Sequence, residues 1–172
     1  MTELDQQLLK FTFKKNYDRD DYFVSTSNYF AFTLLDSWPN WEKNIINICG
    51  EKFSGKTHLA EIFLKKNKGK LIDLKNLNFD EISSLKVFEN IVLENFDNNL
   101  DENTFFSLIN FVDQNNKYLL IISENPINEY KFSLNDLKSR SKNCLIAKIE
   151  QPDDELIKVL LSKSFSDKQI FI

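Results

Sequence analysis

The chain has 172 residues, the length of a single domain that can bury a sizeable hydrophobic core. Its composition, with 42% apolar and 28% charged residues, is ordinary for a globular protein, and its net charge of −4 argues against a broad nucleic-acid-binding surface. It has no apolar run of membrane-spanning length and no secretory signal, and its two cysteines, Cys49 and Cys144, do not form a C-x-x-C pair. We therefore expect a cytoplasmic protein with reduced, buried thiols.

The apolar pattern predicts strands that alternate with helices along the chain. The predicted strands occupy 44–49, 70–74, 90–95, 118–123 and 144–149. The predicted helices occupy 27–38, 57–67, 79–85, a segment that Asp101 caps and that continues through 105–112, 134–141 and 152–165. This alternation indicates an α/β fold, with a parallel sheet covered by helices on both faces.

The first predicted strand leads into GEKFSGKT, residues 50–57, which fits the phosphate-binding pattern G-x-x-x-x-G-K-[ST]. Glycines let the backbone fold around an anion, while Lys56 would reach the β- and γ-phosphates and the Thr57 hydroxyl would ligate Mg²⁺. His58, the only histidine, would lie in the first turn of the following helix. The predicted nucleotide-binding residues here are Gly50, Glu51, Lys52, Phe53, Ser54, Gly55, Lys56, Thr57 and His58. The alternative is an ordinary glycine turn between a strand and a helix.

A P-loop NTPase needs a carboxylate at the end of a neighbouring strand to orient Mg²⁺ and its water, and Glu94 fits that position. The next residue, where most such enzymes carry the acid that polarises the attacking water, is Asn95, and an amide cannot accept a proton. Asp97 would be a misplaced substitute. The sequence therefore supports nucleotide binding better than turnover. The alternative for Glu94 is a strand-end carboxylate in a surface ion pair.

Three segments resemble the DnaA-related AAA+ ATPases: FVSTSN (23–28), GEKFSGKTHL (50–59) and LNDLKSR (134–140). Within that group the chain is most similar to the Hda-type regulatory inactivators of the replication initiator. The resemblance implies an AAA+ nucleotide-binding domain over 22–172, a five-stranded parallel sheet of order 5-1-4-3-2, and ATP or ADP with Mg²⁺ as ligands. It also implies adenine contacts from Phe23, Val24 and Asn28.

The resemblance assigns further roles outside the P-loop. Glu124, in ISENP (122–126), falls where the family has its first sensor, near the γ-phosphate, and Arg140 falls at the arginine finger. The alternative for Arg140 is a local ion pair at the end of a helix. The leader, residues 1–21, contains QLLKF, which resembles the family's sliding-clamp-binding peptide and offers Gln7, Leu8 and Phe11 as anchors. Lys10 departs from that peptide's apolar pattern, and an edge strand or a tail is the alternative.

The family's fold continues into a helical lid, whereas this chain stops at Ile172, so we expect the lid to be absent, through trimming or loss. The implied function is regulation of chromosomal replication initiation by stimulating ATP hydrolysis on DnaA, without a DNA-binding domain of its own. One rival is an initiator-like adaptor at the origin without a hydrolytic role. Another is a small P-loop kinase or hydrolase, which the presence of only two arginines disfavours. The nucleotide bound at rest and homo-oligomerisation stay open.

Overall fold

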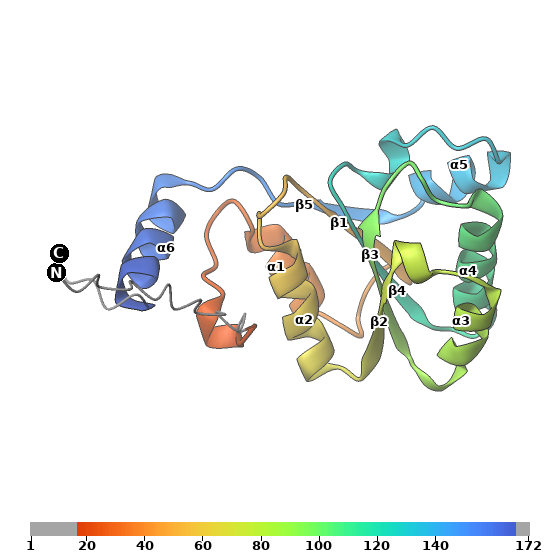
Figure 1. Ribbon diagram of the computed structural model, residues 1–172, viewed down its shortest axis with the longest axis horizontal. Helices are drawn as coiled ribbons and strands as arrows, with labels where there is room; N and C mark the ends of the chain where they lie inside the picture. Colours follow the sequence, from red (N-terminus) through yellow and green to blue (C-terminus); the bar gives the residue numbers. More distant parts are fainter. Residues whose placement is uncertain (1–16, 168–172) are drawn as a thin grey trace, which may run out of the picture.

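The computed structural model describes residues 17–167. Its centre is a five-stranded parallel sheet of order β2-β3-β4-β1-β5, which confirms the predicted order (Figure 1). The strands are β1 Ile45–Cys49, β2 Gly69–Asp73, β3 Asn90–Phe96, β4 Tyr118–Ser123 and β5 Leu145–Lys148. β1 and β4 lie inside the sheet and their residues are almost wholly buried, because helices cover both faces.

Helices lie on both faces of the sheet, as predicted (Figure 1). They are α1 Tyr29–Asp36, α2 Lys56–Lys66, α3 Phe79–Ser84, α4 Glu102–Gln114, α5 Asn135–Lys142 and α6 Asp154–Asp167, with short 3₁₀ turns at Arg19–Asp21, Leu74–Asn76, Leu85–Val87 and Ile127–Glu129. One core lies under α1 and α2, and the other under α3, α4 and α5. Asp101 caps α4 as expected, since its carboxylate accepts from the backbone N–H groups of Asn103 and Thr104.

The carboxyl ends of all five strands meet at one edge of the sheet, because the strands are parallel. The P-loop follows β1 at this edge, and the register places Cys49 beside Ser123 and Asp73 beside Glu94. The ladder between β3 and β4 is irregular after Leu93, where the next residues form a bulge. The segments with predicted nucleotide contacts after β1, β3 and β4 are therefore neighbours in space.

α6 forms at its predicted place but lies away from the sheet, beyond α1 (Figure 1). Side-chain contacts attach it to the beginning of the described chain: the Thr26 hydroxyl donates to Asp153 at 2.8 Å, and Lys163 pairs with Asp21 at 2.5 Å. Along residues 17–167 no helix combines the length and apolar character needed to cross a bilayer. The proposed clamp-binding residues Gln7, Leu8 and Phe11 lie outside the described residues.

Both cysteines are unpaired thiols, as expected. Cys49 is fully buried at the end of β1, but Cys144 is only partly buried, which corrects the expectation of two buried thiols. The Cys144 Sγ lies after the last turn of α5, where it contacts the Arg140 carbonyl oxygen at 3.4 Å.

Candidate nucleotide-binding site

The P-loop turns sharply between β1 and α2. Gly55, directly before α2, has φ 92°, a left-handed conformation that favours glycine. A Cβ at Gly55 would also lie 3.3 Å from the Tyr22 ring. At the other end of the loop, a Cβ at Gly50 would lie 2.8 Å from the Ile149 carbonyl oxygen. The two glycines of the motif are therefore required by backbone conformation and by close packing.

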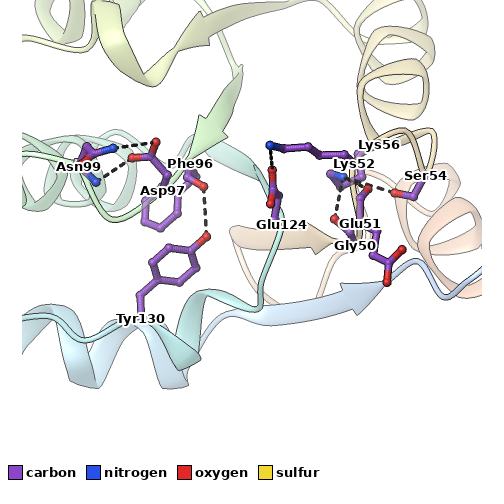
Figure 2. Close-up of polar contacts among 10 residues, drawn as sticks. All are labelled: Gly50, Glu51, Lys52, Ser54, Lys56, Phe96, Asp97, Asn99, Glu124 and Tyr130. Carbon is purple, nitrogen blue, oxygen red and sulfur yellow. Dashed lines mark hydrogen bonds and ion pairs between the residues drawn. The ribbon is translucent and has the colours of Figure 1, made fainter.

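Lys56 points its ammonium group back into the loop (Figure 2). The Nζ donates to the carbonyl oxygens of Gly50 at 2.8 Å and Glu51 at 2.6 Å, and lies 3.4 Å from the Ser54 hydroxyl. Partial burial lowers the pKa of this lysine, and the nearby Glu124 carboxylate opposes that shift. The ammonium group therefore lies inside the loop, where the lysine of a P-loop meets the phosphates of a nucleotide.

Glu124 lies beside the P-loop, where the fold brings the end of β4 next to the end of β1 (Figure 2). Its carboxylate pairs with the Lys52 ammonium at 3.4 Å, and its carbonyl oxygen accepts from the Gly50 N–H at 3.1 Å. Phe53, at the tip of the loop, has φ 66° and a fully exposed side chain. Lys52, Phe53 and Glu124 thus flank the place where Lys56 would meet a phosphate.

Glu94 reaches α2 from the end of β3. Burial raises the pKa of its carboxyl, while a hydrogen bond with the Thr57 side chain opposes that rise. Its Oε1 is buried and has no hydrogen-bond partner within residues 17–167. A buried carboxylate oxygen beside a threonine hydroxyl fits a Mg²⁺ ion or its water, since Mg²⁺ prefers oxygen ligands and retains several waters. Thr57 and Glu94 are therefore the residues here that suit the metal.

Asn95 adopts φ 57° in the bulge of β3, and its amide donates to the Asp73 carboxylate at 2.5 Å. Asp97, two residues on, accepts from the backbone N–H of Asn99 at 2.7 Å and lies away from the P-loop (Figure 2). The carboxylate that sequence reasoning missed is Asp73, which neighbours Glu94 across the β2–β3 ladder and contributes to its raised pKa. A strand-end aspartate gives no local signal for this contact, because it depends on strand pairing.

Asn47, in the middle of β1, is a second residue that sequence reasoning missed. It is fully buried; its amide donates to the Ile121 carbonyl at 3.0 Å and the Ser123 hydroxyl at 2.8 Å, and its oxygen accepts from the Ile127 N–H at 2.8 Å. These bonds attach β1 to β4 and to the loop that carries Glu124. The available signal was the amide of Asn47 between apolar residues in the predicted strand, because buried polar groups need partners.

The segment FVSTSN lies between the first 3₁₀ turn and α1. Asn28 is buried and stabilises this segment internally: its amide donates to the Phe23 carbonyl and its oxygen accepts from the Ser25 N–H, both at 3.0 Å. The Ser27 carbonyl accepts from the Glu150 N–H at 2.9 Å, which connects the segment to the residues after β5. Phe23 and Val24 are only partly buried. Asn28 therefore shapes the segment through hydrogen bonds within it.

His58 lies in the first turn of α2, as expected, and its Nε2 is 3.0 Å from the Asp18 carbonyl oxygen. Its ring packs edge-on against Tyr22, with centroids 5.2 Å apart. The residue therefore holds the preceding segment against α2.

Arg140 lies far from the P-loop of its own chain. Its Nη1 pairs with the Asp113 carboxylate, and Asp113 also accepts from the amide of Asn44, the residue directly before β1, at 2.8 Å. This position is at the amino-terminal edge of the sheet, whereas the P-loop follows the carboxyl end of β1. Both alternatives for Arg140 remain: the local ion pair exists, and the guanidinium is directed away from the chain's own nucleotide site.

No family model matches the chain. Its sequence is 26% identical to the chromosomal replication initiator protein DnaA of Leptospira biflexa over 98% of this chain and 47% of that protein. Domain III of the Thermotoga maritima replication initiation protein DnaA has the same fold, with TM-score 0.71, 21% identity and coverage of 91% of this chain and 76% of that one. AMPPCP-bound DnaA from Aquifex aeolicus superposes with TM-score 0.73 and 16% identity over 91% of this chain and 56% of that one. The chain has the fold of a DnaA AAA+ domain and is weakly similar in sequence to DnaA.

In this DnaA-like fold the predicted P-loop, Glu94 and Glu124 come together at one edge of the sheet, while Arg140 does not join them. The chain spans about half the length of the curated relatives that it matches.

Proposed function

We propose that this chain is an adenine-nucleotide-binding regulator of chromosomal replication initiation that acts on DnaA in the cytoplasm, as Hda-type inactivators do. The observation that carries the proposal is the P-loop with Lys56 enclosed by its backbone, next to a Thr57–Glu94 pair. Support for an adenine nucleotide comes from the AMPPCP-bound relative and from the segment that contains Phe23 and Val24.

In this proposal Lys56 holds the β- and γ-phosphates of ATP or ADP through charge-assisted hydrogen bonds. Thr57 and Glu94 hold Mg²⁺, which when bound would neutralise phosphate charge. Hydrolysis by the chain itself is slow, because position 95 offers an amide that is already bonded to Asp73 and because Asp97 is bonded locally. The protein holds the nucleotide and contributes to catalysis elsewhere.

That contribution is Arg140, inserted across an interface into the ATP site of a DnaA partner. An arginine supplied in trans stabilises the charge that develops on the γ-phosphoryl group and accelerates hydrolysis by roughly 10³- to 10⁵-fold in other P-loop systems. Weak self-turnover and strong stimulation are compatible, because the chain's own P-loop and Arg140 lie at opposite edges of the sheet. The clamp-binding peptide with Gln7, Leu8 and Phe11 would bring the chain to the replicating DNA.

The nucleotide site is tested by calorimetry on the wild-type chain and Lys56→Ala, with ATP, ADP and GTP. We expect Lys56→Ala to abolish adenine nucleotide binding, because the change removes a charged contact to phosphate and no core packing. Lys66→Ala is the matched control, since Lys66 lies at the far end of the same helix and pairs with Asp36. Equal affinities of wild type and Lys56→Ala, or of ATP and GTP, would contradict the assignment.

The action on DnaA is tested by following loss of ATP from DnaA with the sliding clamp, DNA and either the wild-type chain or Arg140→Ala. Stimulation by the wild type alone supports the in-trans role. Stimulation that survives Arg140→Ala refutes it, and no stimulation by either chain favours the adaptor at the origin. Rapid hydrolysis by the chain without DnaA would favour the small P-loop kinase or hydrolase.

A further inference from the structure

Three side chains on one face of α4 contact the Arg140 guanidinium. Phe106, Asn110 and Asp113 follow one another at spacings of four and three residues, so they lie on the same side of the helix. The Arg140 Nη2 donates to the Asn110 Oδ1 at 2.9 Å, the Nη1 pairs with Asp113, and the guanidinium carbon lies 5.6 Å from the centre of the Phe106 ring. The planar group is therefore held by a carboxylate, an amide and an aromatic ring.

The carboxylate of this group is itself fixed. Asp113 uses one oxygen for Arg140, and its other oxygen accepts from the Asn44 amide at 2.8 Å. Asn44 directly precedes β1, so the position of the guanidinium is set by the sheet as well as by α4. This is more restraint than an isolated surface ion pair between two long side chains supplies.

These contacts occupy only some of the N–H donors of the Arg140 guanidinium. Arginine has five N–H donors, and the contacts to Asp113 and Asn110 take one on each terminal nitrogen. The Arg140 side chain is 34% exposed, so the remaining N–H groups can donate to an oxygen of another molecule. Lysine lacks the fork that binds two acceptors and a phosphoryl oxygen together.

We propose that Asp113 and Asn110 are positioning residues that hold the Arg140 guanidinium ready for a phosphoryl oxygen of a partner's nucleotide. The proposal rests on the proposed in-trans role of Arg140. Holding a flexible arginine in place before the partner binds reduces the conformational entropy lost when the phosphoryl group is engaged. Loss of either contact to Arg140 would leave the affinity for the partner unchanged but slow the reaction, because catalysis depends on orientation to within about an ångström.

The test measures the maximal rate of ATP loss from DnaA and the half-saturating concentration of the chain, with clamp and DNA present. Asp113→Asn keeps the shape of the side chain but removes its charge, so that Arg140 faces either an amide NH₂ group or an uncharged amide oxygen. Asn110→Ala removes the other acceptor. We expect each variant to lower the maximal rate by about 10-fold and to leave the half-saturating concentration unchanged. The loss is smaller than the roughly 10²-fold loss expected when a catalytic group is displaced by about an ångström, because one of the two contacts to the guanidinium is kept. Asn110→Ala covers the case in which Asp113→Asn fails to fold, and melting temperatures report folding.

The matched control is Asp36→Asn, which breaks the exposed Lys66–Asp36 pair on the other face of the sheet and should leave the rate unchanged. The double variant Asp113→Asn with Arg140→Ala should be no slower than Arg140→Ala alone, because a residue that acts through Arg140 has no effect without it.

Three results overturn the proposal, each for a different reason. A higher rate with Asp113→Asn would show that the ion pair keeps Arg140 away from the phosphoryl group and so inhibits the reaction. An unchanged rate with both variants, where Arg140→Ala abolishes stimulation, would show that the contacts serve only the fold. An unchanged rate with Arg140→Ala itself would refute the in-trans role on which this inference rests.

Discussion

Replacement of Asn47 by alanine removes the hydrogen bonds that attach β1 to β4 and to the loop after it. The Ile127 N–H loses the acceptor that pairs it, in a place where the Ile127 side chain is fully buried. An unpaired buried donor costs about 1–3 kcal/mol, and the Ile121 carbonyl and Ser123 hydroxyl each lose one contact as well. We expect a total loss of about 3 kcal/mol in the free energy of unfolding.

For a chain of this size, a loss of about 3 kcal/mol corresponds to a fall in Tm of roughly 6–12 °C. Urea unfolding followed by the fluorescence of Trp38 and Trp41 measures the change directly, and an unchanged m-value would show that the extent of unfolding is the same. The matched control is Asn115→Ala, because the Asn115 amide makes its 2.8 Å bond on the exposed end of α4 and its loss should cost no more than about 0.5 kcal/mol. If Asn47→Ala unfolds at the wild-type urea concentration, the buried amide does not stabilise the connection between β1 and the loop.

Three further predictions concern single side chains. Because the pKa of Glu94 is raised, its carboxylate takes up a proton at a higher pH than an ordinary glutamate, so affinity for Mg²⁺-nucleotide should fall as the pH is lowered from 7, and Glu94→Gln should remove this pH dependence in calorimetry. Phe53→Gly should change the free energy of unfolding by less than about 1 kcal/mol, because the side chain is fully exposed at a positive φ, whereas Phe63→Ala, in the core, should cost about 3–5 kcal/mol in the same urea titration. Tyr22→Phe should leave the Tm unchanged or raise it, since the buried Tyr22 hydroxyl has no partner among residues 17–167, and a lower Tm would reveal a contact of that hydroxyl.

The order of the elements and the strand order could be predicted, because both follow from local patterns. Apolar runs such as YLLIIS identify buried strands, and the P-loop marks the carboxyl end of the first one. Rules of connection in parallel sheets and the family resemblance then restrict the order of the strands. The position of α6 could not be read in this way, since its apolar residues predict a helix but not the surface that it covers.

The side-chain contacts at the site depend on residues far apart in the sequence. The Asn95–Asp73 bond joins residues 22 positions apart, and the Asn47–Ser123 bond joins residues 76 positions apart. Sequence reasoning identified Asn95 as the replacement for an acid, but the bulge that turns its amide toward Asp73 follows from the pairing of β3 with its neighbours. Contacts of this kind become visible only when the strands are placed side by side.

The opposite placement of the P-loop and Arg140 separates two tasks that many P-loop enzymes combine around one nucleotide. Lys56, Thr57 and Glu94 lie at the carboxyl edge of the sheet, while Arg140 is fixed at the amino-terminal edge through Asp113 and Asn44. No rotation of the Arg140 side chain can bring it along the length of the strands to the P-loop of its own chain, because an arginine side chain is shorter than strand β1. Arg140 therefore cannot serve the nucleotide site of its own chain, and the in-trans role that we propose for it would require a nucleotide that another protein presents.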